Sequence, residues 1–362
     1  MIAQIQPWIN WKEIYQILKV VKSTFITEGK KTEEFEKLTR DLTKSKYAVS
    51  YANGTLALYA ALKSLKIGNG DEVIVPNLTF IATANAVIMA GAKPVFCEIE
   101  KDTLGISSKN IRKLISNKTK AIMPVHLYGF SCNIDEIISI ANEFKLKVIE
   151  DAAQGVGVHY NGKHVGTYGD IGVLSYYGNK VMTTAEGGMI LTNNEEIFKS
   201  CYRLKNHGRD KKGVFIHDHI GFNFAFTDLQ AAIGVAQIKK LNKIIQSKRK
   251  IFEMYYSELS SIKQLDFYKI RKQENPVYWF SSIYTKDKLE LKKFLALNGV
   301  QTRDFFCPLH LQPCYKEIDL NIGDDFKMSE DIYNFSLSLP SSVILKKREI
   351  RKVIKLIKSF YN

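Results

Sequence analysis

The fold is decided by one stretch of the chain, which reads KVIEDAAQGVG at residues 147–157 and, after a short polar loop, GDIGVLSYYGNKVMTTAEGG at residues 169–188. Each part contains an apolar run typical of a β-strand, VI in the first and IGVL in the second. Ligands bind just outside the carboxyl ends of strands in open α/β sheets. We therefore expect Asp151 and Lys180, which follow these two runs, to converge on one cleft.

These two residue types suit one kind of chemistry. A lysine beside a ligand pocket can form a Schiff base with a carbonyl cofactor, and burial lowers its pKa toward neutrality. An aspartate can pair with a protonated pyridine nitrogen, which keeps the ring an electron sink. Lys180 and Asp151 are therefore what pyridoxal phosphate chemistry requires. Taken singly, each has an ordinary alternative, since a lysine is usually a solvated surface charge and Asp151 could cap a helix.

The remaining chain shows a regular order of elements. Strand-like and helix-like segments alternate from Tyr47 to Thr192, which predicts a parallel sheet joined by right-handed crossovers. A long helical region is expected from Thr227 to about Leu259, as the connection into a smaller domain. The last helix has an apolar stripe with lysines elsewhere on its surface, so we expect it to pack on a core. The stripe consists of Ile350, Val353, Ile354, Ile357 and Phe360.

Composition limits the function classes. The 362 residues are 45% hydrophobic, which is ordinary for a globular enzyme of two domains, and no apolar run approaches the roughly 20 residues of a membrane span. The five cysteines form no C-x-x-C pair and the N-terminus lacks a signal-peptide pattern, so we expect no metal site, no disulfide framework and a cytoplasmic location. The net charge of +15 is spread along the chain, and we expect no nucleic-acid or membrane partner.

The chain resembles the DegT/DnrJ/EryC1/StrS sugar aminotransferases, a family of fold-type-I pyridoxal phosphate enzymes, in EDAAQ at residues 150–154 and GDIGVLSYYGNKVMTTAEGGM at residues 169–189. The resemblance extends from about Ile5 to about Phe360. It implies an α/β fold, with a large cofactor-binding domain at residues 1–240 and a smaller α+β domain at residues 241–362. The large domain should contain a mixed, mostly parallel seven-stranded sheet flanked by helices.

The resemblance also implies how the cofactor is held. The lysine of the family's S-[FY]-[FY]-G-N-K segment carries it, and this lysine is Lys180 here. The GNK form is most similar to the perosamine-synthase branch, which aminates a 4-keto sugar on a nucleotide. Family members bind the cofactor phosphate on the residues matching Gly54, Thr55 and Ser175. On local sequence alone, Thr55 is a plausible helix N-cap, and a capped buried helix without a ligand is the alternative.

Three further cofactor contacts follow from the same resemblance. The residue matching Phe80 stacks on the pyridine ring, and the amide matching Gln154 bonds the ring oxygen, although perosamine synthases often have glutamate there. A polar loop that opens at Asn206 crosses the dimer interface in the family. Asn223 is therefore expected to reach the cofactor phosphate of the neighbouring subunit. Members commonly have arginine where this chain has Ala225.

Two residues are candidates for substrate binding. RDFFCPLH at residues 303–310 matches the family's R-x-F-F-x-P-L-H segment near the substrate, which implies roles for Arg303 and His310. Arg303 suits the diphosphate of a sugar nucleotide, and a pairing with a surface carboxylate is the alternative. His126 could contact the substrate or could be a satisfied buried histidine.

The resemblance implies a homodimeric aminotransferase with shared active sites, which converts a nucleotide-linked keto sugar, expected to be a 4-keto-6-deoxyhexose, into the amino sugar. L-Glutamate would donate the amino group and leave as 2-oxoglutarate, with pyridoxamine phosphate as the intermediate form of the cofactor. The alternatives are amination at C3, a sugar dehydratase of the same fold, and a non-enzymatic cofactor-bound or nucleic-acid-binding regulator. The dehydratases carry histidine in place of Lys180, and only the basic charge supports a regulator.

Overall fold

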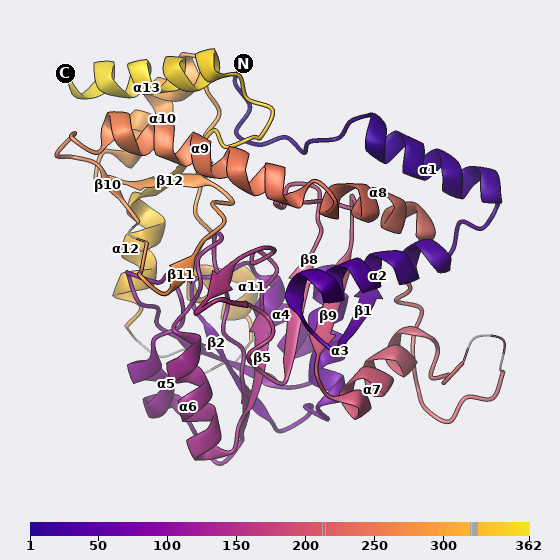
Figure 1. Ribbon diagram of the computed structural model, residues 1–362. Coiled ribbons are helices and arrows are strands. Elements are labelled where there is room, and N and C mark those ends of the chain that lie inside the picture. Colours follow the sequence, from indigo (N-terminus) through magenta and orange to yellow (C-terminus); the bar gives the residue numbers. More distant parts are fainter. Residues whose placement is uncertain (212, 214, 269, 319, 321–324) are drawn as a thin grey trace.

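The computed structural model describes residues 1–362 apart from 212, 214, 269, 319 and 321–324. Its centre is a seven-stranded sheet in which β9 runs antiparallel to both neighbours and the other pairs are parallel (Figure 1). In sheet order the strands are β1 (Tyr47–Tyr51), β9 (Gly188–Thr192), β8 (Ile171–Ser175), β5 (Lys147–Asp151), β4 (Thr119–Ile122), β2 (Glu72–Pro76) and β3 (Lys93–Cys97). The predicted mixed, mostly parallel sheet is confirmed.

Helices cover both faces of this sheet (Figure 1). Alternate residues of a strand point to opposite faces, so β2 sends Ile74 into one core and Val73 and Val75 into the other. Burial on both faces explains why the strands are almost continuously apolar. The first core is closed by α2 (Lys30–Thr43), α5 (Ser108–Leu114), α6 (Ile134–Phe144) and α8 (Asp228–Ile238). The second is closed by α3 (Gly54–Ser64), α4 (Ala82–Met89) and α7 (Glu195–Lys205).

The C-terminal part of the chain forms a smaller antiparallel sheet. Its strands, in sheet order, are β10 (Asp266–Phe267), β12 (Ser281–Tyr284), β14 (Ser336–Leu339) and β13 (Arg303–Asp304). Its core is shared with α9 (Leu241–Leu259), α10 (Lys288–Leu297) and α13 (Lys347–Tyr361). The predicted stripe of α13 is confirmed, because its four isoleucine and valine side chains are buried and Phe360 packs against the same core.

Several connections cross between the two parts. Ile2 pairs with Val300 and packs in the smaller core, whereas Leu309 and Tyr315 pack in a core of the large sheet. The predicted domain boundary between residues 240 and 241 stays a prediction. The remaining elements are α1 (Trp11–Ser23), β6 (His159–Tyr160), β7 (Lys163–His164), β11 (Glu274–Asn275), η1 (Leu309–Leu311), α11 (Pro313–Lys316) and α12 (Lys327–Phe335).

The expected helical region from Thr227 to about Leu259 is present, and it consists of two helices. The structure divides this segment into α8 and α9, with a break around Lys240. The Lys240 ammonium is buried at the break, where it lies 2.7 Å from the Glu13 carboxylate and 2.5 Å from the Trp8 carbonyl oxygen. A buried charge is retained only where it is paired, so this contact fixes the break and anchors α1 against α8.

Candidate active site

A cavity of about 290 Å³ lies at the carboxyl ends of β5 and β8. Eight of the ten predicted site residues line it, namely Gly54, Thr55, Phe80, Asp151, Gln154, Ser175, Lys180 and Arg303. Larger cavities of about 690 Å³ and 890 Å³ lie beside α1 and α2 and beside α9 and β10, respectively. Ligands of open α/β folds bind at the carboxyl ends of the sheet strands. Among the described residues, neither larger cavity is lined by such a strand end of the large sheet.

Neighbouring parallel strands bring the two predicted catalytic residues together. β5 and β8 pair with Asp151 opposite Val173, so both strands end at the same edge of the sheet. Asp151 is the last residue of β5. Lys180 lies in the turn after β8, where its backbone amide donates to the Tyr177 carbonyl at 2.9 Å. Their side chains converge on the cavity, as their positions after the two apolar runs predicted.

The Asp151 carboxylate is buried and held in place by two donors. The Thr83 hydroxyl donates to it at 2.7 Å, and the Ala153 amide donates at 3.1 Å. Burial raises the pKa of Asp151, while these hydrogen bonds and the charge of Lys180 act in the opposite direction. A protonated ring nitrogen beside the carboxylate would add the positive charge that this buried group lacks.

Lys180 is the reactive amine of the cavity. Burial lowers the pKa of Lys180 to about 8, although the Asp151 carboxylate opposes this shift and the Arg303 guanidinium adds to it. The ammonium lies 4.4 Å from the centre of the Trp279 ring. A lysine that loses its proton near neutral pH can act both as a nucleophile and as a base.

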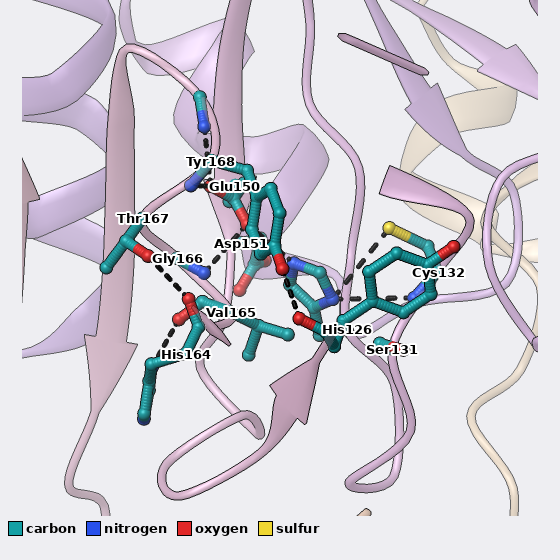
Figure 2. Close-up of polar contacts among 12 residues, drawn as sticks. His126, Ser131, Cys132, Glu150, Asp151, His164, Val165, Gly166, Thr167 and Tyr168 are labelled. Carbon is teal, nitrogen blue, oxygen red and sulfur yellow. Dashed lines mark hydrogen bonds and ion pairs between the residues drawn. The ribbon is translucent and has the colours of Figure 1, made fainter. Parts of the chain in front are cut away.

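A second carboxylate, Glu150, precedes Asp151 in β5 and points to the opposite face of the sheet, because consecutive strand residues point to opposite sides. It is fully buried and accepts hydrogen bonds from His126 Nε2 at 3.0 Å and from three backbone amides of the 166–169 turn at 2.6–2.7 Å (Figure 2). Burial would raise the pKa of Glu150, but these donors outweigh it and lower the pKa. His126 is thus a satisfied buried histidine and does not line the cavity.

The N-terminus of α3 forms one wall of the cavity. Asn53, rather than the predicted Thr55, is the N-cap, since its side chain accepts a hydrogen bond from the Leu56 amide at 3.0 Å. Thr55 therefore lies inside the first turn, on the cavity wall. A Cβ on Gly54 would lie only 3.1 Å from Ser175 Cβ, so glycine allows the helix to approach the end of β8. Free amides at a helix N-terminus bind phosphate.

Two other predicted residues offer contacts to a flat ring. Gln154 is buried, and its Oε1 accepts a hydrogen bond from the Tyr128 amide at 2.7 Å, which leaves its N–H donors for the cavity. The Phe80 ring is 51% exposed although it lines the cavity. Its centre lies 5.5 Å from that of Phe306. An aromatic side chain left open at a cavity is suited to stacking on a planar ligand.

The structure places Asn223 and His310 outside the cavity lining. Asn223 is exposed and pairs with Asn206 through an isolated bridge, so it makes no contact with the cavity of its own chain. The His310 ring lies between Asn77 Nδ2 at 2.7 Å and the Glu330 carboxylate at 3.1 Å. Both of its ring nitrogens are occupied, so its position gives no support to the predicted substrate role, which stays a prediction.

Several lining residues were not found from the sequence. Tyr177, Asn179 and Glu186 belong to the motif around Lys180 and could have been included on that ground. Trp279 gave no local signal, because it begins a C-terminal segment that the sequence marked only as a strand. Its presence in the cavity follows from tertiary packing.

The side chains of this cavity fit pyridoxal phosphate. They provide an amine with a lowered pKa, a buried carboxylate that lacks a full positive partner, a helix N-terminus beside a serine hydroxyl, and an open aromatic face. These match the aldehyde, the ring nitrogen, the phosphate and the ring plane of that cofactor in turn. The fit rests on groups contributed by β5, β8, α3 and the loop before α4.

Comparison with known proteins agrees with this geometry. Residues 7–358 match the model of the DegT/DnrJ/EryC1/StrS aminotransferase family. The chain is 36% identical over 371 residues to GDP-perosamine synthase of Vibrio cholerae, covering 100% of both chains, and 37% identical over 361 residues to that of Escherichia coli O157:H7, covering 99% and 98%. A crystal structure of a DegT DnrJ EryC1 StrS aminotransferase from Brucella abortus superposes with a TM-score of 0.92 at 28% identity, covering 97% of this chain and 95% of the other.

Proposed function

The chain belongs to the DegT/DnrJ/EryC1/StrS aminotransferase family, and from this premise we propose that it aminates a GDP-linked 4-keto-6-deoxyhexose with L-glutamate as the amino donor. It is a pyridoxal phosphate-dependent nucleotide-sugar aminotransferase. The GDP-perosamine synthases among its relatives support GDP as the nucleotide and a 4-keto sugar as the acceptor. The observation that carries the proposal is the convergence of Lys180 and the buried Asp151 on one cavity.

Each of these cavity residues is assigned a separate role in holding the cofactor. Pyridoxal phosphate supplies an aldehyde that can carry an amino group and a ring that takes up an electron pair. Lys180 Nζ is the proposed attachment point of the cofactor. The Asp151 carboxylate keeps the proton on the ring nitrogen by its negative charge. Gly54, Thr55 and Ser175 are assigned to the phosphate group, through the amides of α3 and the serine hydroxyl.

When its amine is not bonded to the cofactor, Lys180 Nζ would be able to act as a base. Its pKa of about 8 allows the amine to take a proton from the donor's α-carbon and to return it without a large energetic cost near neutral pH. The same amine then serves in reverse when the keto sugar receives the amino group. Arg303 adds a positive charge to this cavity and is assigned to an anionic group of the substrate.

We further propose that the chain acts as a homodimer in which Asn223 completes the partner's site. Asn223 is exposed, and the segment after α7 extends away from the large sheet (Figure 1). Apolar side chains on this segment are unusually open to solvent, with Phe215 82%, Ile216 72% and Ile220 87% exposed. Exposed apolar clusters of this kind mark interaction surfaces, and a second copy of the chain is the occupant that a shared active site requires.

The exposed face of α1 supports the same assembly. Its Trp11, Ile14, Tyr15 and Leu18 are each more than 40% exposed and follow the spacing of one helical face. Across the described residues, each helix is too short or too polar to pass through a membrane. We place the enzyme in the cytoplasm as part of the proposal, where nucleotide-linked sugars and glutamate are both at hand.

A substrate panel tests the proposed function. The purified protein, loaded with pyridoxal phosphate, is incubated with L-glutamate and with 4-keto-6-deoxy sugars linked to GDP, UDP or dTDP, and with a 3-keto analogue. We expect the GDP-linked 4-keto sugar to be consumed with equal release of 2-oxoglutarate. Faster turnover of a 3-keto sugar or of another nucleotide would overturn the substrate assignment. Consumption without 2-oxoglutarate would identify a dehydratase.

A further inference from the structure

Trp279 lies in the wall of the cavity although it comes from the smaller domain, 99 positions after Lys180 in the sequence. It directly precedes Phe280 and β12 and is 1% exposed. No motif around Lys180 includes it. Trp279 packs in the first core of the large sheet, directly before the chain enters β12 of the smaller sheet.

The indole of Trp279 contacts two consecutive residues of that segment. Its Nε1–H donates to the Asn179 carbonyl oxygen at 2.7 Å, and its ring face lies 4.4 Å from the Lys180 ammonium. The first contact fixes the peptide that leads into Lys180. The second supports the end of the same side chain through a cation–π interaction. A single ring therefore determines both where the Lys180 backbone lies and where its amine rests.

Trp279 is itself held rigidly, which a positioning role requires. Its ring stacks on Phe280 with centres 4.2 Å apart, and lies 5.9 Å from the Tyr128 ring. Its carbonyl oxygen accepts a hydrogen bond from Lys248 Nζ at 2.9 Å, and Lys248 also donates to the Ser341 carbonyl at 3.1 Å. Thus α9 anchors the backbone of Trp279 while aromatic neighbours fix its ring.

The two hydrogen bonds that Lys248 Nζ donates, to the carbonyl oxygens of Trp279 and Ser341, are called the Lys248 clamp below, and they suit this anchoring role. Burial lowers the pKa of Lys248 to about 7, so that above this pH its amine is largely neutral and still has two N–H donors for two carbonyl oxygens. The amine therefore satisfies both carbonyls without the cost of a buried charge. It makes no contact with the cavity itself.

We propose that Trp279 is a positioning residue for Lys180, which holds the Asn179–Lys180 peptide by its indole N–H and the amine by its ring face. This inference rests on the proposed role of Lys180. Its test reads the Lys180 segment directly, in protein without cofactor, so a failure of the role of Lys180 and a failure of the role of Trp279 give different results.

The test compares Trp279→Phe with Trp8→Phe. The control makes the same substitution at a ring that also carries a lysine ammonium, that of Lys240 at 4.6 Å, but lies away from the cavity. Hydrogen exchange is measured by mass spectrometry on peptides covering residues 176–184 and, as an internal reference, β1. The visible circular dichroism of the bound cofactor, divided by its absorbance, is then measured after loading with pyridoxal phosphate.

For Trp279→Phe we expect exchange in residues 176–184 to accelerate about fivefold, the factor that one net hydrogen bond provides, while β1 is unchanged. The dichroism per bound cofactor should fall, because the attachment point is no longer fixed. Trp8→Phe should change neither quantity. Unchanged exchange in residues 176–184 would overturn the proposal, and so would faster exchange in β1 as well, which would make Trp279 a general core residue.

A second variant protects the test against misfolding of the first. Lys248→Met removes the clamp on the Trp279 carbonyl and leaves the indole in place. We expect the same local acceleration with a smaller amplitude, confined to residues 176–184 and the strand that follows Trp279. An effect that spares residues 176–184 would contradict the link from α9 to Lys180. If the wild-type protein bound no cofactor while the two variants still showed these exchange changes, only the function of Lys180 would be refuted.

Discussion

Ala185 provides a test of how the chain is bent beside the active site. It lies within the motif around Lys180 and directly precedes Glu186, which lines the cavity. Its φ angle is 72°, in the left-handed region, and its methyl group is exposed. For a residue with a Cβ this conformation costs about 1–2 kcal/mol relative to the right-handed region. This conformational free energy therefore destabilises the loop that contains Lys180.

The perturbation is Ala185→Gly. Glycine adopts a positive φ without strain, while its greater freedom in the unfolded chain costs about 0.4–1 kcal/mol. The exposed methyl group contributes little packing that could be lost. The difference predicts a net gain of about 0.5–1 kcal/mol in the free energy of unfolding.

The matched control is Ala296→Gly. Ala296 is also exposed but lies in the last turn of α10 with helical backbone, where glycine is less favourable than alanine by up to about 1 kcal/mol. The same chemical change should therefore have opposite signs at the two positions. Urea unfolding followed by circular dichroism measures both, at unchanged m value. A loss of stability in Ala185→Gly equal to that in Ala296→Gly would refute the reasoning.

Three further predictions follow from the site and its supports. In protein without cofactor, the rate of acylation of Lys180 by a trace reagent should rise with a midpoint near pH 8, because burial depresses its pKa; a midpoint near the ordinary lysine value of 10.5 would contradict this. Glu150→Gln should lower the free energy of unfolding by about 2–4 kcal/mol, because an amide cannot accept all four buried donors, and a urea midpoint equal to wild type would show that the cluster is not stabilising. Mixing equal amounts of Lys180→Ala and Asn223→Asp after subunit exchange should restore activity to about a quarter of the sites, and no recovery despite mixed dimers in native mass spectrometry would place Asn223 within its own chain.

The large sheet was predictable because its signals are local. The apolar runs that became β5 and β8 are followed by Asp151 and Lys180, and parallel pairing brought the ends of the two strands to one edge of the sheet. The stripe on α13 was equally direct, since its period matches one buried helical face. The family resemblance supplied the sheet's strand number and most of the cavity wall.

The details that the sequence did not predict arose where a distant residue decides the local structure. The break between α8 and α9 depends on Glu13 and Trp8, which bind Lys240 from the other end of the sequence. The cap of α3 was assigned to Thr55 because threonine is a good N-cap. In the structure the helix begins at Gly54, one residue before Thr55, and Asn53 accepts the hydrogen bond from the Leu56 amide. The periodicity of apolar residues in the sequence predicts neither the break at Lys240 nor the cap at Asn53.

The candidate site residues from the C-terminal part of the chain show the same limit. Trp279 reaches Asn179 only because the segment before β12 packs beside the turn after β8. His310 matched a motif near the substrate, yet both of its ring nitrogens form hydrogen bonds, one with Asn77 and one with Glu330. A motif gives the residue type and its segment, whereas the direction of the side chain depends on the packing of all the elements around it.

The central claim is that Lys180 carries the cofactor opposite Asp151. The direct measurement is to load the protein with pyridoxal phosphate, reduce it with borohydride, digest it and map the modified peptide by mass spectrometry. The account predicts one cofactor per chain, on Lys180, and none on Lys180→Ala. Cofactor found on another lysine in the wild-type protein would contradict it.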